Sequence, residues 1–138
     1  MNDKKILGDS GEHYALSMFG FAGYPCSKLP DNWKYYDLIV QKDNKIERIS
    51  VKARSETKSF SKSSWFIFES TGQYEWVVFI VKFKSGELKS WVIPVSVALK
   101  YASIQQGSSM NPTDRRLAWG KLESPELTRY LNNWTLIK

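Results

Sequence analysis

The order of helical and strand-like segments is the feature that most limits the folds open to this sequence. A helical pattern at about residues 9–19 is followed by a series of strand-like segments, and helical patterns return near the end. The strand-like segments are at about 35–40, 46–53, 65–69, 74–83 and 88–94, and the later helices at about 95–101 and 125–134. This order predicts an α/β fold with a central mixed β-sheet flanked by helices. With 138 residues and neither an internal repeat nor a linker, the sequence predicts a single domain over residues 1–138.

The first helix carries a carboxylate on its apolar side. Asp9 followed three residues later by Glu12 is a capping-box pattern, which predicts that the helix begins at Asp9, and Gly20 predicts its end. Glu12 falls at the same angle as Ala15 and Phe19. Because unpaired burial of a charge is costly, we expect Glu12 either to reach solvent at the helix end or to have a buried partner.

The composition excludes several classes of protein. With 42% hydrophobic and 14% aromatic residues the chain is expected to pack as a globule. Cys26 is the single cysteine, which excludes a disulfide framework or a cysteine zinc site and fits a reducing cytoplasm. His13 is the single histidine, which excludes Ser-His-Asp triads and multi-histidine metal sites. No apolar run approaches the ~20 residues that span a bilayer, so no membrane helix is expected, and the first residues do not resemble a signal peptide. A net charge of +6 favours nucleic acid as a partner.

The residues with chemical content lie on the first predicted hairpin. Asp37 opens an apolar strand, Asp43-Asn44 forms the turn, and alternation puts Ser50 and Lys52 on one face of the returning strand. An aspartate and a lysine that converge beside core residues have two readings. One is a salt bridge that stabilises the sheet, and the other is a metal site, in which Asp37 binds Mg²⁺ and Lys52 stabilises a scissile phosphate or orients water.

These residues have the spacing of a known motif. The pattern consists of a helix with Gly11-Glu12, then Asp37 before an apolar strand, and then Lys52 as the last residue of Ser50-Val51-Lys52. It resembles the PD-(D/E)xK nuclease superfamily, which includes restriction endonucleases and archaeal Holliday-junction resolvases. The resemblance covers about residues 8–95. It implies a restriction-endonuclease-like core and an Mg²⁺-dependent endonuclease, with Mn²⁺ as the other candidate ion, that hydrolyses DNA. Because many such nucleases cut both strands as dimers, it also implies a homodimer.

The resemblance assigns roles to individual residues. It implies Glu12, Asp37 and Lys52 as catalytic residues, and Asp37, the Val51 carbonyl, Ser50 and Glu12 as the metal environment. Ser50 stands where the superfamily usually has Glu or Gln, and a hydroxyl is a weaker Mg²⁺ ligand than a carboxylate. The sequence therefore leaves a second hypothesis open, a catalytically inactive relative that keeps the fold and binds nucleic acid or a protein partner. A third is a scaffold in which the Asp37–Lys52 pair only stabilises the sheet.

Basic residues cluster around this hairpin. Residues 42–62 hold seven Lys and Arg against three Asp and Glu, a net charge of +4. Phosphate binding needs such a local concentration, whereas the alternative is a solvated loop. Trp33, beside two tyrosines, is predicted either to stack on a base or to cover the edge of the sheet. The residues predicted to bind nucleic acid are Arg54, Lys58, Lys62, Arg115 and Arg116.

Overall fold

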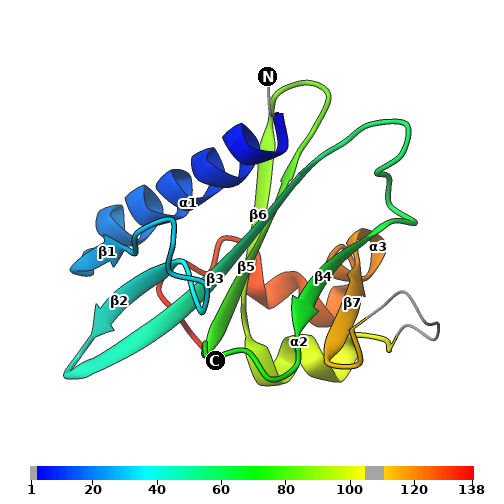
Figure 1. Ribbon diagram of the computed structural model, residues 1–138. Coiled ribbons are helices and arrows are strands. Elements are labelled where there is room, and N and C mark those ends of the chain that lie inside the picture. Colours follow the sequence, from blue (N-terminus) through cyan, green and yellow to red (C-terminus); the bar gives the residue numbers. More distant parts are fainter. Residues whose placement is uncertain (1–2, 105–110) are drawn as a thin grey trace.

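The chain folds into a five-stranded mixed sheet and a two-stranded ribbon with helices packed around them, as described for residues 3–104 and 111–138 by a computed structural model (Figure 1). The predicted α/β class with a central mixed sheet is confirmed. The strands of the sheet, in spatial order, are β1 (Cys26–Lys28), β2 (Leu38–Lys42), β3 (Lys45–Ser55), β5 (Trp76–Lys82) and β6 (Leu88–Pro94). The ribbon pairs β4 (Trp65–Glu69) with β7 (Asp114–Ala118), and the helices are α1 (Asp3–Phe21), α2 (Val95–Tyr101), α3 (Trp119–Leu122) and the 3₁₀ helix η1 (Pro125–Tyr130).

The sheet has one long strand that continues beyond its neighbour. β3 pairs antiparallel with β2 and parallel with β5. The pairing with β2 ends at Leu38 opposite Ile49, but β3 continues to Ser55 and remains paired with β5 throughout. We call this point, where β2 begins and the edge of β3 beyond Ile49 is left without a neighbouring strand, the fork.

Two apolar layers hold the sheet between them. On one face α1 packs Ala15 and Phe19 against the sheet, and on the other face the ribbon packs Phe66 and Phe68 against Phe79. Six of the seven residues of β5 are buried, as expected of a central strand covered on both faces. In Figure 1 α1 and the ribbon lie on either side of the long β3.

The position of α1 depends on a close approach to β3. A Cβ atom built on Gly11 would lie 2.9 Å from the Cβ of Ala53 and 3.6 Å from Cδ1 of Ile80. Only a glycine therefore lets the helix backbone pack this near the strand. The residue that follows is Glu12, so this contact also determines where the Glu12 carboxylate lies.

Both ends of α1 differ from the sequence prediction. The predicted capping box at Asp9 is wrong, because the helix begins at Asp3 and places Asp9 in its interior. There the Asp9 carboxylate accepts a hydrogen bond from Lys5 at 2.9 Å, a favourable i,i+4 pair. The helix ends at Phe21 rather than at Gly20, and Gly23, at φ +100°, supplies the positive φ of the turn that follows.

The remaining elements agree with the prediction in part. The bounds predicted for 65–69, 88–94 and 95–101 are confirmed, whereas β1, β7 and α3 were not predicted. The predicted terminal α-helix at 125–134 is wrong: the segment is a 3₁₀ helix that ends at Tyr130. Residues 105–110, which follow the helix predicted at 95–101, lie outside the described residues. No helix among the described residues is long and apolar enough to cross a membrane.

Candidate functional site

The fork is shaped by the side chain of Asp37. The Asp37 N–H donates to the Ile49 carbonyl at 2.9 Å, and its Oδ2 accepts a hydrogen bond from the Val51 N–H at 2.7 Å. The carboxylate thus replaces the backbone partner that a longer β2 would supply. Since the N–H and C=O of one strand residue point to the same edge, the Val51 carbonyl is directed to the open edge of β3 as well.

The start of β2 corrects the sequence prediction. The predicted strand begins at Tyr35, whereas β2 begins at Leu38. In the observed register, a strand that started at Tyr35 would continue the pairing up to Lys52 and would close the edge. The Asp37 carbonyl instead accepts a hydrogen bond from the Leu29 N–H at 2.9 Å, so the chain before β2 turns away as a loop.

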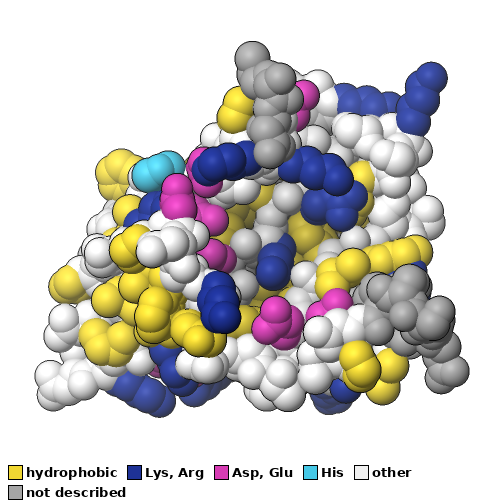
Figure 2. Space-filling model, in the orientation of Figure 1, with side chains coloured by type: hydrophobic (Ala, Val, Ile, Leu, Met, Phe, Trp, Pro, Cys, Tyr) yellow, Lys and Arg dark blue, Asp and Glu magenta, His cyan; other side chains and the backbone are white. Residues whose placement is uncertain are grey.

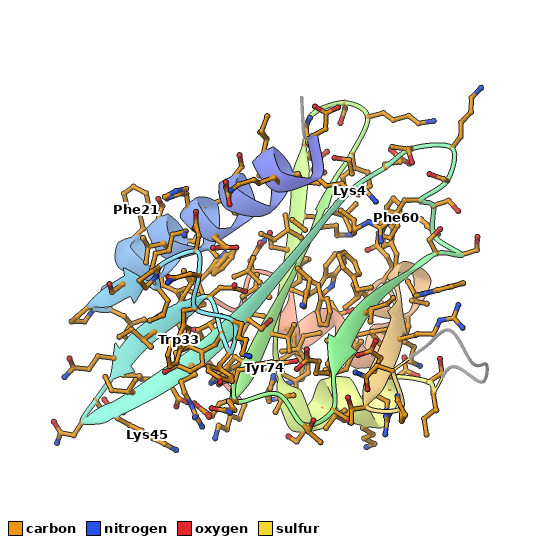
Figure 3. The ribbon with its side chains drawn as sticks, viewed as in Figure 1. Lys4, Phe21, Trp33, Lys45, Phe60 and Tyr74 are labelled. Carbon is orange, nitrogen blue, oxygen red and sulfur yellow. The ribbon has the colours of Figure 1, made fainter. Side chains whose placement is uncertain are left out.

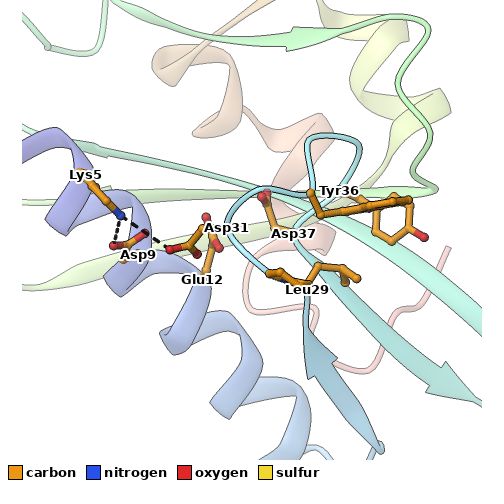
Figure 4. Close-up of a pocket in the computed structure, with 9 residues that line it drawn as sticks. Lys5, Asp9, Glu12, Leu29, Asp31, Tyr36 and Asp37 are labelled. Atoms are coloured by element: carbon orange, nitrogen blue, oxygen red, sulfur yellow. Dashed lines mark hydrogen bonds and ion pairs between the residues drawn. The ribbon is translucent and has the colours of Figure 1, made fainter.

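Glu12 and Asp37 line one pocket of about 150 Å³ beside the fork. Figure 4 shows their carboxyl groups together with that of Asp31, one from α1 and two from the loop before β2. The Nζ of Lys28 lies 3.3 Å from Glu12 Oε1 and 2.8 Å from Asp31 Oδ1. Of the two expectations for Glu12, the structure therefore shows a partner, which is Lys28.

The surroundings of the two carboxyl groups make their charged forms unfavourable. Burial raises the pKa of Glu12, and the nearby charge of Asp37 raises it further, while Lys28 opposes both. Burial also raises the pKa of Asp37, against the opposing effects of the Val51 N–H and then of the Lys52 and Lys28 charges. Two carboxyl groups close enough to repel each other, in a partly desolvated pocket, are an arrangement that a cation would stabilise.

Ser50 and Lys52 share one face of β3, as the alternation predicts, and in the structure this face looks toward the ribbon. In the parallel register Ser50 is opposite Val77 and Lys52 opposite Phe79, and both of these partners belong to the apolar layer under the ribbon. Ser50 is buried and Lys52 half-buried. Within the described part of the chain no direct ion pair joins Lys52 to Asp37, although the Lys52 charge acts on the Asp37 carboxyl.

Sequence reasoning missed Lys28, which pairs with two carboxyl groups of this pocket, those of Glu12 and Asp31. It lies on β1, a strand of three residues between turn-forming segments, where no periodic pattern can develop. Its closeness to Glu12 follows from the pairing of β1 with β2 and from the packing of α1, neither of which a local pattern encodes.

Three of the residues predicted to bind nucleic acid, Arg54, Lys58 and Lys62, lie beyond the fork, at the end of β3 and in the loop that follows it. Arg54 places its guanidinium 4.3 Å from the ring centre of Phe60, which is buried and stacks on Trp119. Phe60 therefore anchors a loop on which Lys58 and Lys62 remain exposed. This loop is ordered around a buried ring, so its basic side chains are held next to β3.

The other two residues predicted to bind nucleic acid, Arg115 and Arg116, lie on β7, and the end of β7 is joined to the loop that carries Lys58 and Lys62. Arg116 lies on β7 with its guanidinium 3.3 Å from the ring centre of Trp65, and Arg115 donates to the carbonyl oxygens of Pro112 and Asp114. The N–H of Gly120, just after β7, donates to the Lys62 carbonyl at 2.9 Å. Figure 2 shows a hollow in this face, with acidic side chains on its α1 side and again at its lower edge, and with Lys and Arg side chains above it and inside it.

No group of three or more His, Cys, Asp or Glu side chains in residues 3–104 and 111–138 is arranged to hold a metal ion. What the fork offers a cation is the carboxyl groups of Glu12 and Asp37, and the carboxyl groups of Asp9 and Asp31 line the same pocket.

Comparisons with known proteins bear on the fold. No protein-family model and no curated protein sequence matches the chain. Among solved structures it is similar to that of a bacterial homing endonuclease, I-Ssp6803I, with 18% sequence identity and a TM-score of 0.60 over 99% of this chain and 91% of the other. The chain thus has the fold of a structure described as an endonuclease.

Proposed function

We propose that this protein is a nuclease of the PD-(D/E)xK type that hydrolyses phosphodiester bonds of DNA with Mg²⁺ or Mn²⁺. The observation that carries the proposal is the juxtaposition at the fork: Glu12 and Asp37 line one pocket, and the Lys52 charge acts on Asp37 from the open part of β3. The likeness to a homing endonuclease structure supports the fold on which this arrangement is built.

The donors at the fork fit a hard divalent cation. Mg²⁺ prefers oxygen ligands and is commonly held by one or two carboxylates, with water and substrate phosphate completing its shell. Asp37 uses Oδ2 for the Val51 N–H, which leaves Oδ1 to bind an ion beside the Val51 carbonyl and the Glu12 carboxylate. Glu12 would exchange part of its interaction with Lys28 for the ion. The nearby Asp37 charge raises the pKa of Glu12, and a dication between the two carboxyl groups would offset this repulsion.

Each residue then has a role that follows from its place. A bound Mg²⁺ would supply Lewis acidity and an activated water. Asp37 and Glu12 hold negative charge at the pocket, where the cation would bind. Lys52 presents an ammonium group along the open edge of β3, where it stabilises the negative charge that develops on a phosphate. Lys28 sets the orientation of Glu12. The basic residues beyond the fork, Arg54, Lys58 and Lys62 with Arg115 and Arg116, provide the electrostatic attraction for a phosphate backbone. A homodimer would bring two such sites to the two strands of a duplex.

A single neutralising substitution tests the metal site. Asp37→Asn keeps an oxygen that can accept the Val51 N–H but removes the charge, so we expect the fold to persist. The rise in melting temperature on adding Mg²⁺ or Mn²⁺ should be lost, and nicking of plasmid DNA should be abolished. Asp43→Asn is the matched control: it removes the same charge from a turn residue at φ +58°, which Asn adopts readily, and it lies outside the pocket. A variant with Asp37→Asn that still responds to Mg²⁺ as the parent does contradicts the assignment.

The inactive, nucleic-acid-binding relative is the second candidate, and Ser50 is the observation that favours it. A buried hydroxyl supplies no charge to an ion at the fork. If Ser50 occupies a ligand position, Ser50→Glu should increase the stabilisation by Mg²⁺ relative to the parent. A parent protein that binds DNA in a salt-dependent manner, but neither binds Mg²⁺ or Mn²⁺ nor cleaves DNA, identifies the second candidate as the correct one.

A further inference from the structure

The loop before β2 exposes aromatic side chains at the rim of the candidate site. Trp33 is 41% exposed and Tyr35 is 40% exposed, and Lys34 between them is exposed as well. The Trp33 ring centre lies 4.9 Å from that of Tyr35 and 5.7 Å from that of Tyr36, in edge-to-face geometry with both. Large aromatic side chains left in water in one cluster, next to a candidate active site, are the pattern of a binding surface.

This loop is held in place at both ends. The Leu29 N–H donates to the Asp37 carbonyl at 2.9 Å, which closes the loop at its base, and the Trp33 N–H donates to the Pro30 carbonyl at 2.9 Å. The side chain of Lys28 pairs with Asp31 at 2.8 Å. Trp33 is therefore displayed by a closed loop, with Tyr36 supporting its ring from the side of the core.

The aromatic cluster and the carboxyl groups share one pocket. Trp33 and Tyr36 line the same cavity as Glu12 and Asp37, and Asp37 directly follows the loop in sequence. Figure 3 places Trp33 in front of the sheet beside the start of β2. The Nζ of Lys34 lies 5.6 Å from the ring centre of Tyr35, so a positive charge stands beside the exposed rings. A ligand that reaches the fork with a phosphate meets rings and an ammonium group at the same time.

We propose that Trp33 stacks on an unpaired base of the DNA substrate, next to the phosphate held at the fork. Every base offers a π-face to an indole, whereas in an uninterrupted duplex each base has both faces covered by its neighbours. The substrate class is therefore DNA that carries an unpaired nucleotide, such as a bulge, a flap or a single strand, rather than a fully paired duplex. This inference rests on the proposed function for the position of the phosphate, and the stacking itself requires no metal ion.

Binding to matched DNAs tests the inference without catalysis. Fluorescence anisotropy in EDTA compares a fully paired duplex, the same duplex with a single-nucleotide bulge, and the single strand. The parent protein should bind the bulged duplex and the single strand more tightly than the paired duplex. Trp33→Ala should weaken binding to the bulged duplex and the single strand by roughly 5- to 100-fold. The affinity of this variant for the paired duplex should stay within about twofold of that of the parent. Trp33→Phe, which retains a ring, should retain most of the preference.

Phe21→Ala provides the matched control. Phe21 is an aromatic residue that is 87% exposed at the end of α1, and it does not line the pocket. This variant should bind all three DNAs as the parent does. A 2-aminopurine at the bulged position gives an independent readout, because its fluorescence should fall on binding to the parent and not on binding to the variant with Trp33→Ala.

Three results would overturn the stacking proposal. The first is that the parent binds paired and bulged DNA with equal affinity, and the second is that Trp33→Ala lowers the affinity for all three DNAs by the same factor. The third is that Trp33→Ala changes the oligomeric state without any change in DNA binding. The last would identify the cluster as an interface between copies of the chain. Failure of the proposed catalysis has a different signature, since it leaves the EDTA binding data intact and removes the response to Mg²⁺ and the cleavage.

Discussion

Gly11 links the stability of the fold to the geometry of the candidate site. A Cβ at this position would lie 2.9 Å from the Cβ of Ala53, which is attached directly to the backbone of β3 and cannot rotate away. The added methyl of Gly11→Ala must therefore push α1 and β3 apart. Because Glu12 is the next residue, the same displacement moves its carboxylate relative to Asp37.

The expected magnitude comes from two opposing contributions. Overpacking of a buried contact costs about 1–3 kcal/mol, and replacing glycine by alanine inside a helix returns about 1 kcal/mol. Gly8 isolates the second contribution: it lies in the same helix, and a Cβ there meets nothing within 4 Å. Gly8→Ala should thus be stabilising, and Gly11→Ala should be less stable than Gly8→Ala by about 1–3 kcal/mol. For a chain of this length that corresponds to a difference in melting temperature of about 3–10 °C.

Denaturation in urea and thermal unfolding of the two alanine variants measure this difference. A double variant that adds Ala53→Gly to Gly11→Ala removes the clashing methyl, so the two substitutions should couple by about 1 kcal/mol or more. Gly11→Ala should also weaken the Mg²⁺ response, and the double variant should restore part of it. Equal stabilisation by Gly11→Ala and Gly8→Ala would refute the close approach of α1 to β3.

Two further outcomes follow from the polar groups of the fold. Burial and the Asp37 charge raise the pKa of Glu12 above its ordinary value of 4.5, so the folded state holds this proton more tightly than the unfolded state does. In EDTA the melting temperature should therefore fall as the pH rises through this raised pKa. The fall should be shallower in the variant with Glu12→Gln. An equal slope of melting temperature against pH in the parent and the variant would contradict the desolvation of the Glu12 carboxyl group. Asn133 is buried and donates from Nδ2 to the carbonyl oxygens of Val92 at 3.1 Å and Ile137 at 2.8 Å. In urea titrations Asn133→Leu should therefore lower the free energy of unfolding by about 1–3 kcal/mol. An unchanged urea midpoint would mean that water satisfies the two carbonyl oxygens in the variant.

The sequence predicts those parts of the site that depend on local alternation. Ser50 and Lys52 lie on one face of β3 because side chains alternate along any strand, and Glu12 faces inward because of the helical repeat. The identity of its partner could not be predicted, since Lys28 reaches Glu12 only through the pairing of β1 with β2.

The fork itself was beyond local reasoning. Tyr35 and Tyr36 fit a strand as well as a loop. The outcome is decided by hydrogen bonds from other segments, from Val51 to the Asp37 carboxylate and from Leu29 to the Asp37 carbonyl. β7 was missed for a related reason. It begins with Asp114 and two arginines, and its strand conformation depends on pairing with β4, some fifty residues earlier.

The open part of β3 also has a consequence for solubility. Backbone groups without a neighbouring strand are a template for pairing with another chain, and proteins protect such edges with charged side chains or by restricting access. Here Lys52 and Arg54 place positive charge along the exposed stretch, and α1 and the ribbon stand on either side of it. An edge guarded in this way repels a second copy of the chain, which carries the same charges, while it still admits a polyanion. Neutralising both basic residues should therefore increase self-association, so the residues assigned to the substrate would also keep this strand from forming intermolecular sheets.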